Sequence, residues 1–198
     1  MFNPRFLVVS LGNPLAKYES LHSAGHFALN GLAKALGQAC FREMTLGKQS
    51  CLVSQGPKHT LVQSPTLMNV SGPFVARAWQ DMVKQGDAAS LSLVVVHDEL
   101  EKDLGVVRLT AWERSARGHN GVKSVKKCLS QEKYPLSPFV RVAVGIGRPA
   151  TRDAASVSKY VLDKISAEQR RVLEEVVPWD VAKMLAELED EWRSEVQT

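Results

Sequence analysis

The stretch that decides the fold is Leu91-Ser-Leu-Val-Val-Val-His97-Asp-Glu99. Its first six residues, rich in Val and Leu, predict a buried strand, and its last three are polar. Other runs rich in Val, Leu and Phe are bounded by turn residues and predict the remaining strands of one sheet. These runs are Arg5 to Leu11, Leu61 to Ser64, Val106 to Leu109 and Phe139 to Gly145.

Helical patterns lie between these runs. Ala24 to Leu36 has apolar residues at a period near 3.6 and stops at Gly37, a usual helix end. Gly72 to Gln85 comes directly after Ser71, which is the expected N-cap. Strands that alternate with helices favour the α/β class. Two shorter helices are predicted at Gly121 to Leu129 and Ala154 to Leu162.

The C-terminal part of the chain is predicted to be helical. Ser166-Ala-Glu-Gln169 has the spacing of a capping box ahead of an apolar-periodic stretch. Pro178 should break or kink this stretch, so that a second, acidic helix extends from the proline to about Ser194.

Length and composition indicate an ordinary globular protein. The chain has 198 residues, of which 44% are apolar and 23% charged. A chain of this length buries roughly two-thirds of its unfolded surface, so we expect a single compact domain over residues 1–198. Its apolar runs are far shorter than the roughly 20 residues that span a bilayer, so no membrane association is expected.

Cysteine usage and the N-terminus bear on location. Cys40, Cys51 and Cys128 are an odd number without C-x-x-C spacing, so no disulfide framework or zinc ribbon is predicted. The first residues continue directly into a predicted strand, without the pattern of a signal or transit peptide. A cytoplasmic protein that acts as a monomer is expected, and the mitochondrial matrix stays an alternative.

The charge is unevenly distributed. The formal net charge is +4, but residues 179–198 carry six acids against two bases. Between Arg108 and Lys133 seven bases accompany only two acids, Glu113 and Glu132. Such a stretch suits an anion, most often a nucleic acid, although a solvated basic face explains it equally well.

Four polar clusters occur where loops of an α/β sheet commonly build a site. Taken singly, their asparagines, His22 and Asp98 are also explained as helix caps, turn residues or a helix-start histidine. The clusters are Gly12-Asn-Pro14 with Tyr18 and His22-Ser-Ala-Gly25, Ser64 to Gly72 around Asn69, His97-Asp-Glu99, and Arg117-Gly-His-Asn-Gly121.

Together the clusters indicate hydrolysis by water. A neutral His22 can act as a general base, and Asp98 can fix its tautomer and stabilise the imidazolium. No G-x-S-x-G elbow is present, so the nucleophile should be water, held with a carbonyl by the amides of Asn69 and Asn120. Phosphate loops and G-x-G-x-x-G are missing from the sequence, and His22 and His26 lack an H-E-x-x-H glutamate. No cofactor or metal is therefore expected.

In this order the clusters closely resemble the bacterial-type peptidyl-tRNA hydrolase family. The matching segments are LVVSLGNP, HSAG, PTLMNVSG, VVVHDEL, ARGHNGV, FVRVAVGIGRP and YVLDK. The form Ser115 to Gly121 looks more like the eukaryotic members. The resemblance implies a mixed, twisted sheet between helices, and cleavage of the ester between a peptide and the terminal ribose of tRNA, without metal or cofactor.

The resemblance also implies residue roles. His22 would be the base and Asp98 its orienting acid, with Asn69 and Asn120 completing the catalytic set around the ester. Asn13 would distinguish a blocked from a free α-amino group. The basic stretch would take the acceptor-stem phosphates. The residues expected to bind substrate are Asn13, Tyr18, Leu67, Met68, His119 and Arg141, the last at the family's clamp arginine.

Two departures from the family pattern matter. The segment before His22 is one residue shorter than usual and reads Ser20-Leu21 in place of Thr-Arg. Thr110-Ala-Trp-Glu-Arg114 replaces a segment that carries a clamp lysine. Arg108, Arg114 or Arg117 are the candidates to supply the missing charge.

Two other functions remain as alternatives. One is a non-catalytic RNA-binding relative, like the organellar splicing factors that resemble this family. The other is an esterase of small substrates, for which the basic stretch has no use.

Overall fold

One seven-stranded mixed sheet forms the centre of the protein. A computed structural model describes residues 2–14 and 17–197; Met1, Leu15, Ala16 and Thr198 of the predicted single domain lie outside the described residues. The strand order is β2-β3-β4-β1-β5-β7-β6, and β4, β1, β5 and β7 are parallel. The strands are β1 Arg5–Ser10, β2 Arg42–Leu46, β3 Gln49–Gln55, β4 His59–Gln63, β5 Leu91–Glu99, β6 Val107–Ala111 and β7 Phe139–Gly145.

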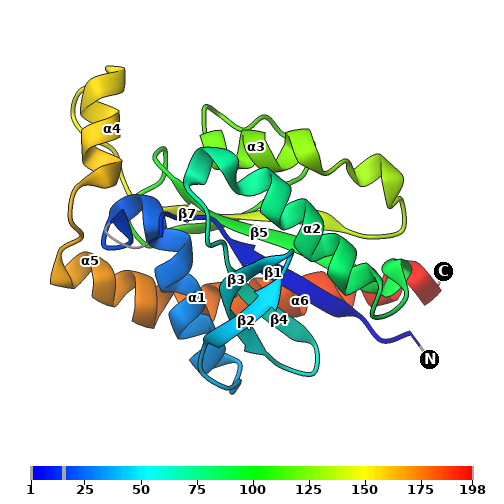
Figure 1. Cartoon of the computed structure of the whole chain (residues 1–198). Helices are drawn as coiled ribbons and strands as arrows, with labels where there is room; N and C mark the ends of the chain where they lie inside the picture. The colour runs from blue at the N-terminus through cyan, green and yellow to red at the C-terminus, as the bar shows by residue number, and fades with distance from the viewer. Residues whose placement is uncertain (1, 15–16, 198) are drawn as a thin grey trace.

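Helices cover both faces of this sheet, as Figure 1 shows. Helices α1 and α6 pack on one face, and α2 and α3 pack on the other. This is the α/β fold with a mixed sheet between helices that the sequence predicts. The helices are α1 Ala24–Ala35, α2 Ser71–Val83, α3 Asn120–Cys128, α4 Ala154–Leu162, α5 Ala167–Arg171 and α6 Val177–Gln197.

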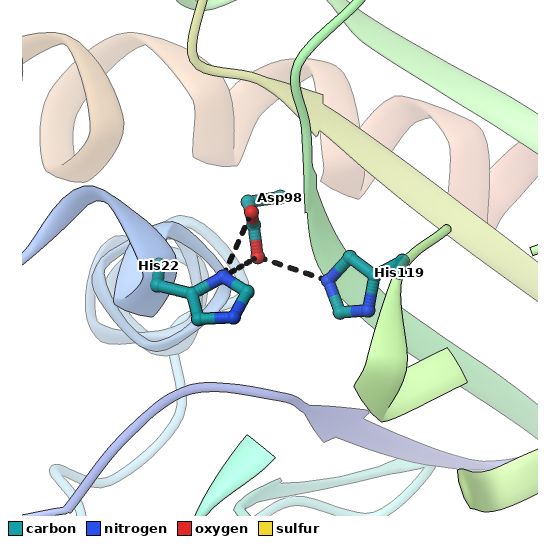
Figure 2. Close-up of side chains that lie close together, drawn as sticks. All are labelled: His22, Asp98 and His119. Atoms are coloured by element: carbon teal, nitrogen blue, oxygen red, sulfur yellow. Dashed lines mark hydrogen bonds and ion pairs between the residues drawn. The ribbon is translucent and has the colours of Figure 1, made fainter. Parts of the chain in front are cut away.

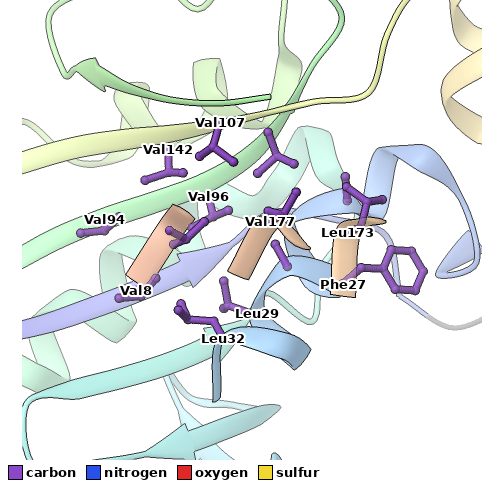
Figure 3. Close-up of a cluster of buried hydrophobic side chains, with 14 of the residues drawn as sticks. Val8, Phe27, Leu29, Leu32, Val94, Val96, Val107, Val142, Leu173 and Val177 are labelled. Atoms are coloured by element: carbon purple, nitrogen blue, oxygen red, sulfur yellow. The ribbon is translucent and has the colours of Figure 1, made fainter. Parts of the chain in front are cut away.

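The central strands contribute side chains to two hydrophobic cores, because successive side chains of a strand point to opposite faces of the sheet. In β5, Val94 and Val96 enter the core under α1 and α6, which Figure 3 shows with Val8 and Leu29. Leu93 and its like-facing neighbours enter the core under α2 and α3. Each such side chain contributes about 1.5–3 kcal/mol when fully buried. The polar end of β5 is thereby fixed at the carboxyl edge of the parallel strands, where sites of open α/β sheets form.

Strands β2 and β3 and the N-cap of α2 differ from the sequence predictions. The two strands form an antiparallel hairpin at the sheet edge, and their many exposed side chains leave no apolar run to detect. Ser71 is the first residue of α2 rather than its N-cap. Its hydroxyl donates back to the carbonyl oxygens of Leu67 and Met68, because a 3-10 turn, Met68–Val70, leads directly into the helix.

The second, acidic helix begins at the proline, as predicted, but the chain stays helical on the way to it. A π-helical segment, Val172–Val176, joins α5 to α6, and Pro178 is in the first turn of α6. A proline cannot donate to the carbonyl four residues earlier, and the wider turn before it accommodates this loss. The carbonyl of Glu174 and the ring of Pro178 instead pack on Gly31 of α1, where a Cβ would not fit. The capping box at Ser166 and Gln169 is confirmed.

Among the described residues, no helix has both the length and the apolar character needed to cross a membrane.

Candidate active site

His22 and Asp98 meet, as the sequence predicts. His22 lies in a 3-10 turn, Leu21–Ser23, just before α1, and Asp98 is near the end of β5. His22 Nδ1 is 2.9 Å from each carboxylate oxygen of Asp98, as Figure 2 shows. The side chain of Asp98 is 3% exposed and that of His22 is 19% exposed. The acid is therefore buried and the imidazole reaches solvent.

His119 is a second histidine on the same carboxylate. Its Nε2 is 3.0 Å from Asp98 Oδ1, and its Nδ1 accepts the backbone N–H of Val122 as the N-cap of α3. The proton of a neutral His119 must therefore be on Nε2, which donates to Asp98. The family resemblance assigns His119 to substrate binding, but its described contacts hold Asp98. Its position directly before a helix start is the sequence signal for this capping role.

The shared carboxylate controls the protonation of His22. Burial alone would lower the pKa of His22, but the charge of Asp98 and its hydrogen bond outweigh burial and raise that pKa above 6.5. Burial likewise opposes the charge on Asp98, yet the two histidines hold the pKa of Asp98 well below its usual range. Asp98 is therefore a carboxylate, His22 Nδ1–H donates to it, and the lone pair of His22 Nε2 is the basic one.

His97 is next to Asp98 but cannot serve as the base. Its Nδ1–H donates to the carbonyl oxygen of Asp98 at 2.8 Å, and its ring contacts that of His119 edge to face. Burial lowers the pKa of His97 to about 3, so the ring is neutral near pH 7. His97 thus fixes the backbone that carries Asp98.

Of the three predicted asparagines, Asn120 lines the pocket beside this histidine pair, and Asn13 and Asn69 are not among its lining residues. Asn120 is exposed at the start of α3 and lines the same pocket as His22. Asn69 is exposed on the turn Met68–Val70, and Met68 packs against Gly121 of α3. The side chain of Asn13 accepts the backbone N–H of Met68 at 3.3 Å. Leu67 is exposed on the same turn.

A pocket of about 880 Å³ opens beside His22 and Asp98. It runs along β6, the loop before α3 and the face of α4. Its lining is rich in cations: Lys102, Arg108, Arg114, Arg117, Arg148 and Arg152. The basic stretch of the sequence therefore lies beside the candidate catalytic pair. Lys102, Arg148 and Arg152 add to its charge, although they are outside that stretch in the sequence.

Like Asn13 and His119, Tyr18 is engaged by hydrogen bonds within the protein. The Tyr18 hydroxyl bonds to Gln63 and Asn30, and its ring stacks on His26. Tyr18 is therefore held beside α1 and is not among the residues that line the pocket. Tyr18 belongs to the segment before His22 that is one residue shorter than the family pattern.

Arg141 lines the pocket, but its guanidinium is also engaged within the protein. It is 2% exposed, and its guanidinium donates to the carbonyl oxygens of Ala111, Arg114 and Ser115. These bonds engage Nη1 and Nη2 under the loop, and contact of Arg141 with phosphate stays a prediction. A sequence cannot distinguish such a buried arginine from a surface one.

His22, Asp98 and His119 are also the described residues that could hold a metal ion. Their ligand atoms lie within 4.8 Å of one another. A cation would have to displace the hydrogens of both Nδ1 and Nε2 and would enter past a cationic rim. The present hydrogen bonds suit proton transfer.

The comparisons with known proteins agree with this geometry. A family model described as peptidyl-tRNA hydrolase matches residues 7–197. A peptidyl-tRNA hydrolase of Carboxydothermus hydrogenoformans is 37% identical over 174 residues, which cover 85% of this chain and 84% of that protein. A probable peptidyl-tRNA hydrolase of Schizosaccharomyces pombe is 34% identical over 170 residues, covering 85% and 75%.

Solved structures show the same relation. The crystal structure of peptidyl-tRNA hydrolase from Acinetobacter baumannii matches with a TM-score of 0.64 and 26% identity, and the match covers 89% of this chain and 84% of that one. The strand order, the joined histidine and aspartate, and the match over nearly the whole sequence lead to one conclusion: the chain belongs to the peptidyl-tRNA hydrolase family.

Proposed function

We propose that this protein hydrolyses the ester bond between a peptide and the terminal ribose of tRNA, with His22 as the base that activates water. One observation carries the proposal. His22 Nδ1 is bonded to a buried carboxylate at 2.9 Å, which leaves Nε2 to accept a proton beside a cationic pocket. Peptidyl-tRNA supplies both an ester and a polyanion, and an ester is activated enough for water and a tuned base.

The reaction proceeds in two proton transfers. His22 Nε2 takes a proton from water while the water oxygen bonds to the ester carbonyl carbon, which gives a tetrahedral intermediate and an imidazolium. Asp98 stabilises that positive charge. The bond to the ribose oxygen then breaks, and the imidazolium returns its proton to that oxygen. The products are a peptide carboxylic acid and a tRNA with a free ribose hydroxyl.

The surrounding residues position the two halves of the substrate. Asn69 and Asn120 hold the water and the carbonyl with neutral amides, which do not compete for protons. Asn13, Leu67 and Met68 contact the peptide end, where Asn13 distinguishes a blocked from a free α-amino group.

The cations of the pocket take acceptor-stem phosphates, which fix the register of the RNA without reading its sequence. Action as a monomer in the cytoplasm stays a prediction.

Hydrolysis assays test the proposal directly. The protein is incubated with N-blocked aminoacyl-tRNA, with free aminoacyl-tRNA and with a small ester, alongside His22→Ala. We expect release from the blocked tRNA alone, and loss of that release in the variant. Tight tRNA binding without release would instead assign an RNA-binding protein, and small-ester turnover indifferent to tRNA would assign a general esterase.

A further inference from the structure

Two buried or half-buried cations hold the loop between β6 and α3, residues 112–118, which we call the basic loop. From β7, Arg141 donates to the carbonyl oxygens of Arg114 at 2.8 Å and Ser115 at 3.4 Å. From α3, Lys126 Nζ donates to the carbonyl oxygens of Glu113 at 3.3 Å and Arg114 at 3.0 Å. The loop is thus held by hydrogen bonds to the carbonyls of three successive residues, Glu113, Arg114 and Ser115, which fix its conformation.

The hydrogen bonds that hold the loop form no ion pair, although the charges of Glu99 and Glu113 act on Arg141 and that of Glu113 acts on Lys126. Arg141 and Lys126 are paired with neutral carbonyls, and Arg108, Arg114 and Arg117 are exposed. Within the described ranges 2–14 and 17–197, no carboxylate oxygen lies within 4.0 Å of the charged nitrogens of these three arginines. Arg108, Arg114, Arg117 and Arg141 line the pocket, whose seven cations outnumber its three acids, Asp98, Glu99 and Glu101. This excess of positive charge attracts an anion from outside the chain.

Arg117 has the rarest backbone conformation in this loop. Its φ is +43° and that of Gly118 is +88°, and the His119 N–H donates to the Ala116 carbonyl at 2.8 Å. This is a tight turn with both central residues left-handed, a turn that favours Asn or Gly at the first of them. A long side chain there is strained, and strain of this kind persists where the surroundings impose it, commonly at functional sites.

The turn also places Arg117 close to the chemistry. Arg117 is two residues before His119, whose ring is bonded to Asp98, and three before Asn120. The pocket beside His22 is lined by Arg117, His119 and Asn120 as well as by His22 itself. Arg108 enters that pocket from β6, and the carbonyl of Arg114 is the one that both holding cations share.

We propose that Arg117 is the residue that binds the RNA phosphate nearest the scissile ester, and that its strained turn is retained because it directs this guanidinium into the pocket. This inference rests on the proposed function and goes beyond it, because it selects one arginine of three as the replacement for the missing lysine charge. Arg108 and Arg114 contribute to the general attraction. Arg141 and Lys126 are positioning residues that hold the loop.

The chain offers a matched control for this residue. Lys48 is exposed in the hairpin turn between β2 and β3, where its φ is +62° after Gly47 at +59°. Arg117→Gly and Lys48→Gly each remove one positive charge. Each also replaces a side chain on a backbone of positive φ by glycine, which adds the same backbone freedom at both positions. Only Arg117 is in the pocket.

The test measures binding of deacylated tRNA across a salt series, KM and kcat with N-blocked aminoacyl-tRNA, and the melting temperature. For Arg117→Gly we expect an affinity about tenfold weaker, a KM about tenfold higher, and a slope of log affinity against log salt shallower by about 0.7–0.9. For Lys48→Gly we expect none of these changes. Neither variant should melt below the wild type, because glycine relieves the strained φ. Arg117→Lys should keep the wild-type salt slope.

Two outcomes overturn the inference. One is an Arg117→Gly protein with the wild-type affinity and salt slope, and the other is an equal loss in Lys48→Gly, which would reflect net charge alone. Failure of the proposed function is distinguishable, because the binding measurements use uncharged tRNA and need no turnover. A protein that releases no peptide but shows the Arg117 effect would disprove the hydrolase and leave the phosphate contact.

Discussion

Asp98→Asn is the substitution that separates orientation and charge from substrate contact. Asp98 is buried and accepts hydrogen bonds from His22 Nδ1 at 2.9 Å and from His119 Nε2 at 3.0 Å. An asparagine has one acceptor oxygen for two N–H donors, and its amide N–H₂ faces a ring nitrogen. The variant therefore favours the wrong tautomer of His22 and leaves the imidazolium without a counter-charge.

The size of the loss is set by the charge separation. With the centres of imidazolium and carboxylate about 4 Å apart and an effective dielectric constant near 20, their attraction is about 4 kcal/mol. An interaction of about 4 kcal/mol that forms as His22 becomes charged corresponds to roughly a thousandfold in rate. The tautomer change adds to this loss, so kcat should fall by roughly 10³–10⁴.

The assay is single-turnover hydrolysis of N-blocked aminoacyl-tRNA as a function of pH. The base acts in its neutral form, so the wild-type rate rises with pH and has its midpoint above 6.5, since Asp98 raises the pKa of His22. In Asp98→Asn the raising charge is gone and burial remains, so the midpoint should move to lower pH. Binding of deacylated tRNA should change by less than about threefold, because the residue is buried.

The matched control is Asp81→Asn, which removes a carboxylate that accepts the Gly47 N–H at 2.9 Å, on α2. It should keep wild-type turnover. A kcat within tenfold of the wild type in Asp98→Asn, or a pH midpoint that does not move, would refute the reasoning.

Three further predictions concern stability and the loop. Burial lowers the pKa of His26 and of His97 to about 3, below the unfolded value, so the unfolded chain binds more protons in acid and stability falls as pH falls from 6.5. Urea unfolding should show about 1.4 kcal/mol lost per pH unit for each histidine, and His26→Gln should flatten the curve; the raised pKa of His22 acts in the opposite direction. Glu189 pairs with Lys58 at 2.7 Å and with Arg193, and so joins α6 to the turn before β4. Glu189→Gln should cost about 1–2 kcal/mol in urea unfolding, and no effect would indicate a solvent-screened pair. The Nζ of Arg141→Lys ends one bond short of the Nη2 of Arg141, which donates to three backbone carbonyls, so trypsin should cut the basic loop faster than in the wild type. An unchanged cleavage rate would exclude the positioning role of Arg141.

Local sequence patterns predict most of the helices and the central strands. Residues 154–162 and the Ser166 capping box are confirmed at the positions predicted, because caps and apolar periodicity are local signals. The β2–β3 hairpin has no such signal, since an exposed edge strand carries polar side chains on both faces. The proline correctly predicts where the second, acidic helix begins, whereas the π-helical segment before it, which packs against Gly31 of α1, has no local sequence signal.

The sequence by itself determined the fold class, the family and the pair His22 and Asp98, because these depend on residue types in a collinear order. Only the tertiary structure decided which side chains point where. It turned Tyr18 toward α1, buried Arg141 under the basic loop and brought His119 onto Asp98. The physical reason is that a polar side chain bonds to whatever partner the fold places beside it, and such partners are distant in the chain: Arg141 and the carbonyl of Ala111 are 30 residues apart.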